Sequence, residues 1–407
     1  MSTTASTSAR AETRFPWLGL IVLAAAVFLA VTGEMLPTGL LPDMSGDLGV
    51  SEPLVGILVT VFAFTVVATS APLTALTARM PRHALLVVAV IVLGLANVAT
   101  ASAPNYAVVI ACRVVGGLAH GLFFSVVGAY AGYLVSKEHI ARAVSIALGG
   151  GTLAFVFGVP LATALGHAVG WRTAFLIVGA LTVAAAALVW RFLPAVTRPA
   201  VGVDTAAIPV RCDPTIPAVV VVCVVTAITM IGHYAFYTYI APYAIQLGGV
   251  EAAAISPLLF AAGVAGAAGL LLAGWLFGRH PTRGLLCALG TVIVAVAGIG
   301  MLAGLPVPSL LAFIVWNVAF GMLPPLLQTR LLHAASARIR DTASAFYTTA
   351  FNAGIGGGAL VGAVLYDTLG LASLPWVYAG IVVVAFAIVA ITSRRRSAPA
   401  QPATITS

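Results

Sequence analysis

Apolar stretches of about 20 residues, separated by short polar segments, recur along the whole chain. A helix of that length is roughly 30 Å long, which matches the hydrocarbon core of a bilayer. The pattern predicts an all-α membrane protein with twelve transmembrane helices. The predicted spans are 17–41, 53–77, 84–103, 105–135, 142–166, 172–193, 215–246, 253–277, 284–304, 308–332, 342–366 and 374–392.

A proline-rich, polar segment separates the sixth predicted span from the seventh. This composition is typical of a linker, so we expect two six-helix halves. The predicted parts are a cytoplasmic tail (1–16), an N-terminal bundle (17–193), a cytoplasmic linker (194–214), a C-terminal bundle (215–393) and a cytoplasmic tail (394–407).

The two halves repeat at a constant spacing of 200 residues. The matching pairs are Pro42 and Pro242, Gly49 and Gly249, Arg79 and Arg279, Gly121 and Gly321, Gly158 and Gly358, and Gly170 and Gly370. The Arg-x-Pro pair is the most informative, because both copies stand in corresponding loops and are followed by Leu-Leu. The repeat predicts two six-helix bundles related by a pseudo-two-fold axis along the membrane normal.

Composition and charge agree with this class. The chain is 61% hydrophobic and 7% charged, which excludes an ordinary soluble domain. Its basic residues stand singly or in short groups between apolar spans, as in the cytoplasmic loops of membrane proteins, and we expect no nucleic-acid partner. Placing both termini in the cytoplasm leaves only Arg172 outside and Arg113 within the membrane.

Arg113 and Glu34 are ionisable residues deep inside predicted spans. Glu34 lies roughly 10 Å from the end of its span and Arg113 roughly 12 Å from the start of its own, so both fall in the outer half of the bilayer. Intramembrane charges are costly and usually functional, which predicts a coupling site; the alternative is a structural ion pair. Burial favours a neutral carboxyl and a nearby arginine favours a charged one, so bundle motion that changes their proximity would switch proton affinity. His120, two turns beyond Arg113, is either a proton relay or a histidine bonded to a carbonyl group.

Three segments carry a family resemblance. TGEMLPTGLLPDM over 32–44 resembles the first-helix pattern of the twelve-helix drug:proton antiporter branch of the major facilitator superfamily. RVVGGLAHG over 113–121 resembles the fourth-helix pattern of that branch. GGGTLAFVFGVPLATALG over 149–166 resembles the fifth-helix antiporter motif, with Gly150, Gly158 and Pro160 at the positions that permit close helix packing and a bend.

The Gly-Val-Pro at 158–160 and FNAGIGGG over 351–358 are similar to the chloramphenicol and sugar (arabinose-type) efflux subgroup. This resemblance implies the major facilitator fold and a proton-relay role for Arg113. It also implies proton-coupled export of a small amphipathic compound, such as a chloramphenicol-like drug, across the bacterial inner membrane. Efflux of sugars, nucleosides or amino acids by the same fold is the alternative.

Several further residues are candidates for substrate contact or gating. Aromatic groups with a polar handle and neutral amides suit an uncharged amphipathic substrate, although the same groups also form interfacial belts and helix bridges. The substrate-binding candidates are Phe123, Phe124, His233, Tyr234, Tyr237, Asn317 and Asn352. The gating-loop candidates are Arg79, Arg82, Arg279 and Arg283.

An intramembrane enzyme is the rival class. It would need a nucleophile with a base or a metal cluster, and the chain has neither HExxH nor a comparable set. A nucleotide-binding Gly-x-x-x-x-Gly-Lys-Ser/Thr loop is also missing. We therefore expect a transporter, with no metal and no cofactor. Its expected partners are a small-molecule substrate, protons and the lipid bilayer, and we expect it to act as a monomer.

Overall fold

The computed structural model describes residues 15–77, 80–136, 139–194, 213–277, 280–336 and 339–397. Twelve helical segments in this part of the chain are long and apolar enough to cross a membrane, which confirms the predicted fold class. In chain order the helices are α1 (Trp17–Gly39), α2 (Leu41–Leu48), α3 (Glu52–Leu76), α4 (Arg82–Ala101), α5 (Tyr106–Tyr133), α6 (Ile140–Leu153), η2 (Ala154–Gly158), α7 (Val159–Val169), α8 (Trp171–Phe192), α9 (Ile216–Tyr237), α10 (Ile240–Gln246), η4 (Ala252–Ala254), α11 (Ile255–Phe277), α12 (Pro281–Met301), α13 (Pro306–Ala334), α14 (Arg340–Leu369), η5 (Leu371–Ser373) and α15 (Leu374–Ser397).

The seventh predicted span, 215–246, is wrong as one continuous helix. In the structure α9 ends at Tyr237 and the short helix α10 begins at Ile240. Pro242 has no N–H to donate to the carbonyl group of Thr238, so a regular helix cannot continue through this point. Its repeat partner Pro42 stands at the corresponding place, at the start of α2.

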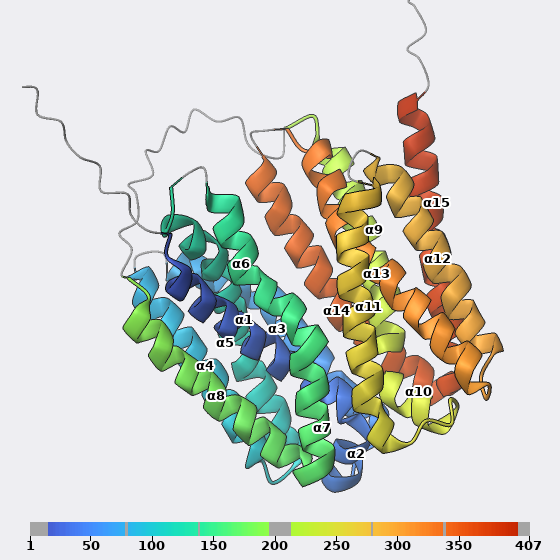
Figure 1. Cartoon of the computed structure of the whole chain (residues 1–407), viewed down its shortest axis with the longest axis horizontal. Helices are drawn as coiled ribbons and strands as arrows, with labels where there is room; N and C mark the ends of the chain where they lie inside the picture. The colour runs from blue at the N-terminus through green and yellow to red at the C-terminus, as the bar shows by residue number, and fades with distance from the viewer. Residues whose placement is uncertain are drawn as a thin grey trace, which may run out of the picture.

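Helices α1 to α8 form one bundle and α9 to α15 the other (Figure 1). The repeat extends to backbone conformation. Gly49 and Gly249 have φ of 64° and 66°, and Gly170 and Gly370 have φ of 90° and 80°. Glycine is favoured at such positive φ angles because it has no Cβ. Each pair marks an equivalent turn in the two bundles.

The predicted tails and linker fall largely on 1–14, 195–212 and 398–407, which lie outside the described residues.

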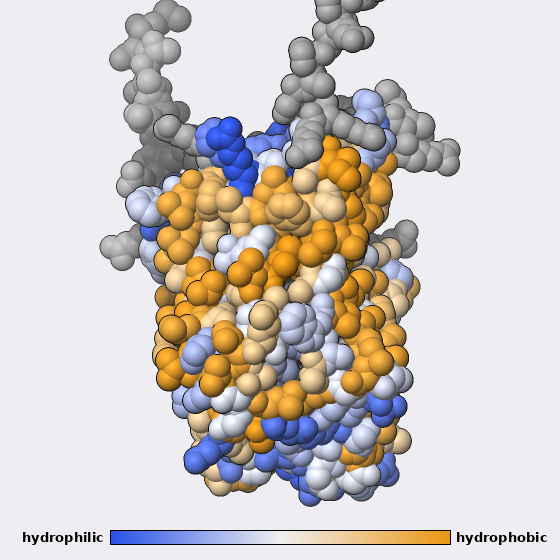
Figure 2. Space-filling view, turned by 90° about the vertical axis from the view of Figure 1, so that its right-hand side faces the viewer, coloured by the Kyte–Doolittle hydropathy of each residue, from blue (hydrophilic) through white to orange (hydrophobic). Residues whose placement is uncertain are grey.

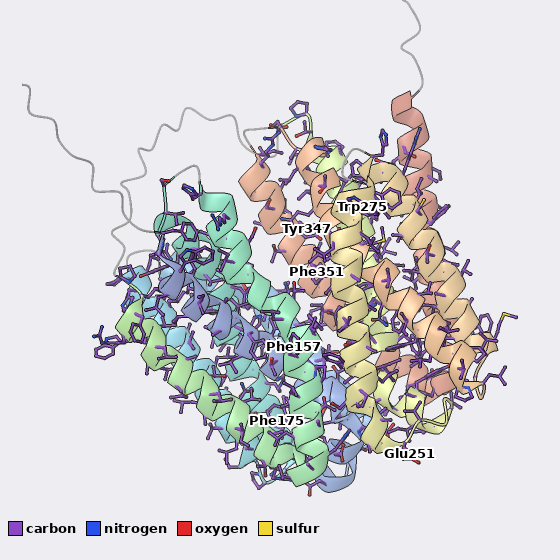
Figure 3. All side chains as sticks on the ribbon, viewed as in Figure 1. Phe157, Phe175, Glu251, Trp275, Tyr347 and Phe351 are labelled. Atoms are coloured by element: carbon purple, nitrogen blue, oxygen red, sulfur yellow. The ribbon has the colours of Figure 1, made fainter. Side chains whose placement is uncertain are left out.

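The surface of the described part is apolar over a wide area. Figure 2 shows one face on which hydrophobic residues cover much of the middle, while hydrophilic residues gather at the lower end and also lie at the upper edge. Leu76 and Trp275 are each 81% exposed. Trp275 is labelled in Figure 3. Exposed side chains of this size indicate a lipid-facing surface.

The two bundles are joined near the end of the molecule that carries α2 and α10, which we call the lower side; α1 begins at the upper side (Figure 1). Four hydrogen bonds join described residues of different bundles, and all of them involve the lower halves of their helices. They are Tyr366 Oη to Glu52 (2.7 Å), Gln246 Nε2 to Glu52 (3.3 Å), Thr60 Oγ1 to the Gly356 carbonyl (3.1 Å) and Ser256 Oγ to the Pro160 carbonyl (2.6 Å). The structure is therefore a state in which the lower side is closed.

Candidate transport site

Arg113 on α5 is held by the backbone of α1. Its guanidinium donates hydrogen bonds to the carbonyl oxygens of Gly33 (3.0 Å) and Glu34 (2.6 Å), and it lies 4.3 Å from the centre of the Phe62 ring. The Gly33 carbonyl lacks a helical partner because Pro37, four residues later, has no N–H. The arginine thus satisfies a carbonyl that the sequence of α1 leaves free, and the ring adds a cation–π contact.

The carboxylate of Glu34 faces His120 and makes no ion pair with Arg113. Glu34 Oε2 lies 3.5 Å from His120 Nε2, and both side chains are buried. Among the ion pairs of the described residues, none joins the Glu34 carboxylate to the guanidinium. The structural Glu34–Arg113 ion pair, which was the alternative to a coupling site, is therefore not formed among the described residues. The carbonyl oxygens of Gly33 and Glu34 accept the arginine N–H groups instead.

His120 is packed between two aromatic rings. Its ring stacks on Phe124 at 4.4 Å and meets the edge of Phe62 at 5.1 Å. The three residues expected to take part in proton coupling thus come together in one place. We call the group Glu34, Phe62, Arg113, His120 and Phe124 the Glu34 cluster.

A second cluster lies in the C-terminal bundle. The ring of His233 on α9 stacks between Phe320 (centroids 3.4 Å apart) and Tyr237 (5.0 Å), and it contacts Tyr234, Trp316 and Tyr378. We call these six residues the His233 cluster. It contains aromatic rings and a buried histidine but no carboxylate and no Lys or Arg. Tyr234 lies within electrostatic range of Glu34, so the cluster borders the N-terminal bundle.

The other substrate candidates have local partners. Phe123 is fully buried and meets Phe124 edge-on at 5.4 Å. The Asn317 amide donates to the Phe313 carbonyl (2.9 Å), and the half-buried Asn352 donates to the Thr348 carbonyl (3.0 Å). Each amide N–H thus bonds to its own helix, while the amide oxygen makes no described hydrogen bond.

The glycines of the fifth-helix motif bring α6 and η2 against α1. A Cβ atom at Gly150 would collide with the carbonyl oxygen of Ala24, and one at Gly158 would collide with Thr32 Oγ1. The chain between them forms the π-helix η2, in which the Val159 N–H bonds to the carbonyl of Ala154. Pro160 cannot supply the next helical N–H, which accounts for the irregular turn before it.

Two of the gating-loop candidates lie in the described part. Arg82 is half-buried at the start of α4, and Arg283 is exposed in the first turn of α12. Arg79 and Arg279 lie outside the described residues.

Four residues of the two clusters were missed by the sequence reasoning. Phe62, Trp316, Phe320 and Tyr378 carry no sequence signal of their own, since each is one apolar or aromatic residue in an apolar helix. The partner of Arg113 did carry a signal. A proline four residues after Gly33 leaves one carbonyl of α1 free, and a buried arginine is a suitable donor.

In the described part of the chain, twelve helices long and apolar enough to cross a membrane form two repeated bundles with one buried polar cluster and one aromatic cluster, which defines a multi-pass helical membrane protein. The family model described as Major Facilitator Superfamily matches residues 23–358. The chain belongs to the Major Facilitator Superfamily.

Two curated relatives are similar over most of their length. A probable sugar efflux transporter of Mannheimia succiniciproducens is 30% identical over 364 residues, covering 89% of this chain and 91% of the relative. A chloramphenicol efflux pump of Mycobacterium tuberculosis is 34% identical over 376 residues, with the same coverage of both chains.

Solved structures agree on the fold. A bacterial homolog of the human lysosomal transporter Spinster, in an inward-facing and unoccupied conformation, has a TM-score of 0.78 and 16% identity, covering 96% of this chain and 100% of that one. A D-xylose-proton symporter has a TM-score of 0.75 and 16% identity, covering 92% of this chain and 97% of that one.

Proposed function

We propose that this transporter is a proton-coupled antiporter that exports a small, uncharged, amphipathic compound, such as a chloramphenicol-like drug, from the bacterial cytoplasm. One observation carries the proposal: the Glu34 cluster holds a buried carboxyl beside an imidazole, and the bordering His233 cluster is aromatic and without formal charge. The first can exchange a proton, and the second suits a neutral ring-containing compound. The relatives named for chloramphenicol and sugar efflux support export as the direction.

The coupling step requires that Glu34 change its protonation as the bundles rock. Arg113 is fixed to the backbone of α1, and α1 and α5 belong to the same bundle, so its distance from Glu34 does not change when the bundles move as rigid bodies. The proposal that proximity to Arg113 switches the carboxyl is therefore revised. The variable factors are access to water from either side and the approach of Tyr234 from the other bundle.

His120 extends this mechanism. A proton that reaches the carboxyl of Glu34 has a second acceptor 3.5 Å away, which suits a relay between the two groups. In the proposed cycle the substrate is bound beside the His233 cluster while the carboxylate of Glu34 is ionised. Protonation from the outside then accompanies release of the substrate there.

The proposed orientation places the upper side in the cytoplasm, because basic residues stand at the described helix ends on that side. They are Arg82, Arg142, Arg191, Arg283 and Arg340. Reporter fusions after Leu76, Phe192 and Ser397 are expected to report the cytoplasm. Fusions near Gly49 and Gly249 are expected to report the outside. A cytoplasmic signal at Gly249 would contradict the orientation of the second bundle.

Export is tested in inverted membrane vesicles prepared from cells that express the transporter. An imposed proton gradient is expected to drive accumulation of radiolabelled chloramphenicol, and a protonophore is expected to abolish it. The same vesicles are tested with L-arabinose. Accumulation of the sugar but not the drug would assign the chain to sugar efflux, and drug accumulation that survives the protonophore would refute proton coupling.

A further inference from the structure

His233 can offer only its edge, not its face, to a transported compound. Both faces of the imidazole are already covered, by Phe320 at 3.4 Å and by Tyr237 at 5.0 Å. A transported compound therefore cannot stack on this ring. Its contact with His233 must be through a ring nitrogen.

A chain of two hydrogen bonds determines which nitrogen carries the proton. Trp316 Nε1 donates to Tyr378 Oη at 3.0 Å, and Tyr378 Oη lies 3.3 Å from His233 Nδ1. An indole N–H is only a donor, so the tyrosine oxygen accepts from it and has its own proton to give. The one acceptor within reach among the described residues is His233 Nδ1.

The opposite arrangement is less favourable. If Nδ1 carried the proton, Tyr378 Oη would accept twice, and its hydroxyl proton would have no acceptor in the described structure. Tyr378 is fully buried, and a buried hydroxyl group without an acceptor is destabilising. The arrangement that satisfies every group places the proton of the neutral imidazole on Nε2.

Nε2 is the ring atom available to a compound. Nε2 makes no hydrogen bond to a described residue. It is also not completely enclosed by protein atoms, although His233 as a whole is only 3% exposed. The cluster also borders the N-terminal bundle through Tyr234. An N–H donor thus remains open at the edge of a ring that is otherwise packed on both faces.

We propose that Trp316 and Tyr378 are positioning residues that hold His233 as its Nε2–H tautomer, so that it donates a hydrogen bond to an acceptor oxygen of an uncharged transported compound. Carbonyl, nitro and hydroxyl oxygens all qualify. This inference rests on the proposed function, since it names the feature by which the same site selects its substrate. It adds a directional hydrogen bond to an otherwise uncharged aromatic cluster.

The tautomer is measured directly by nitrogen NMR of the full-length transporter with ¹⁵N-labelled histidine, and the His233 signals are assigned by their loss in His233→Gln. The parent is expected to show a protonated Nε2 and an unprotonated Nδ1. Tyr378→Phe is expected to give a mixture of tautomers. Tyr243→Phe is the matched control, because it removes a hydroxyl that bonds to the Ile299 carbonyl instead. A protonated Nδ1 in the parent, or an unchanged tautomer in Tyr378→Phe, would overturn the proposal.

Affinity for chloramphenicol tests the donor role. His233→Leu is expected to weaken binding about tenfold, which corresponds to one lost hydrogen bond. His233→Gln places an amide N–H near the same position and is expected to restore most of the affinity. If His233→Leu binds like the parent, the donor role is wrong. If the parent binds neither chloramphenicol nor L-arabinose, recognition by His233 is overturned, and the vesicle assay separately decides whether the proposed export fails with it.

Discussion

Replacing Glu34 with glutamine is expected to reduce proton-driven chloramphenicol accumulation to the level of vesicles without transporter, while downhill exchange continues. The amide is nearly the same size as the carboxyl but cannot take up or release a proton in this pH range, so substrate movement is uncoupled from the gradient. Inverted vesicles with an imposed pH gradient measure the first property. Exchange of labelled against unlabelled drug at equal concentrations measures the second.

Glu251→Gln is the matched control for this variant. Glu251 (labelled in Figure 3) is an exposed carboxylate in the turn before η4 of the C-terminal bundle and makes none of the contacts of the Glu34 cluster, so its replacement is expected to leave uphill export unchanged. Uphill export by Glu34→Gln at the parent rate would show that the proton site lies elsewhere, and His120→Gln would then be the next variant to measure.

Gly150→Ala is expected to be the most destabilising small substitution in the N-terminal bundle. The added methyl group would collide with the backbone carbonyl oxygen of Ala24 on α1, and a backbone atom cannot rotate away as a flexible side chain can. Forced separation of packed helices costs about 3 kcal/mol. Thermal unfolding of the purified variant is expected to begin at a clearly lower temperature, with less folded protein recovered.

The neighbouring glycine provides the control. A Cβ at Gly149 would meet no atom within 4 Å, so Gly149→Ala is expected to unfold like the parent. Equal stability of the two variants would contradict the close packing of α6 against α1.

The length of the apolar runs was sufficient to predict an all-α membrane protein with twelve spans. Each spanning helix needs its own long apolar run, because no water is present in the bilayer to satisfy an exposed backbone. The number of spans and the repeat of the two halves were therefore readable from the sequence. The break at Thr238 and Tyr239 was missed because apolar residues continue across it, although Pro242 marked the place.

The candidate site was predictable in part. Glu34, Arg113 and His120 stand out because ionisable groups are rare in apolar helices, and the structure brings them together. Which atoms pair was not predictable, since that depends on side-chain direction and on the carbonyl group that Pro37 leaves free. The His233 cluster depends on the rotations of α9, α13 and α15 about their axes, which a uniformly apolar sequence does not specify.

The four hydrogen bonds between the bundles imply that little free energy is needed to break the polar contacts that close the lower side. Each contributes about 1 kcal/mol net, so the polar contacts that keep the lower side closed together amount to a few kcal/mol. One charge crossing a membrane potential of 100 mV releases about 2.3 kcal/mol. These contacts are thus of the same order as the work that a single proton can deliver, and a gate held by a large ion-pair network would need several protons in each cycle.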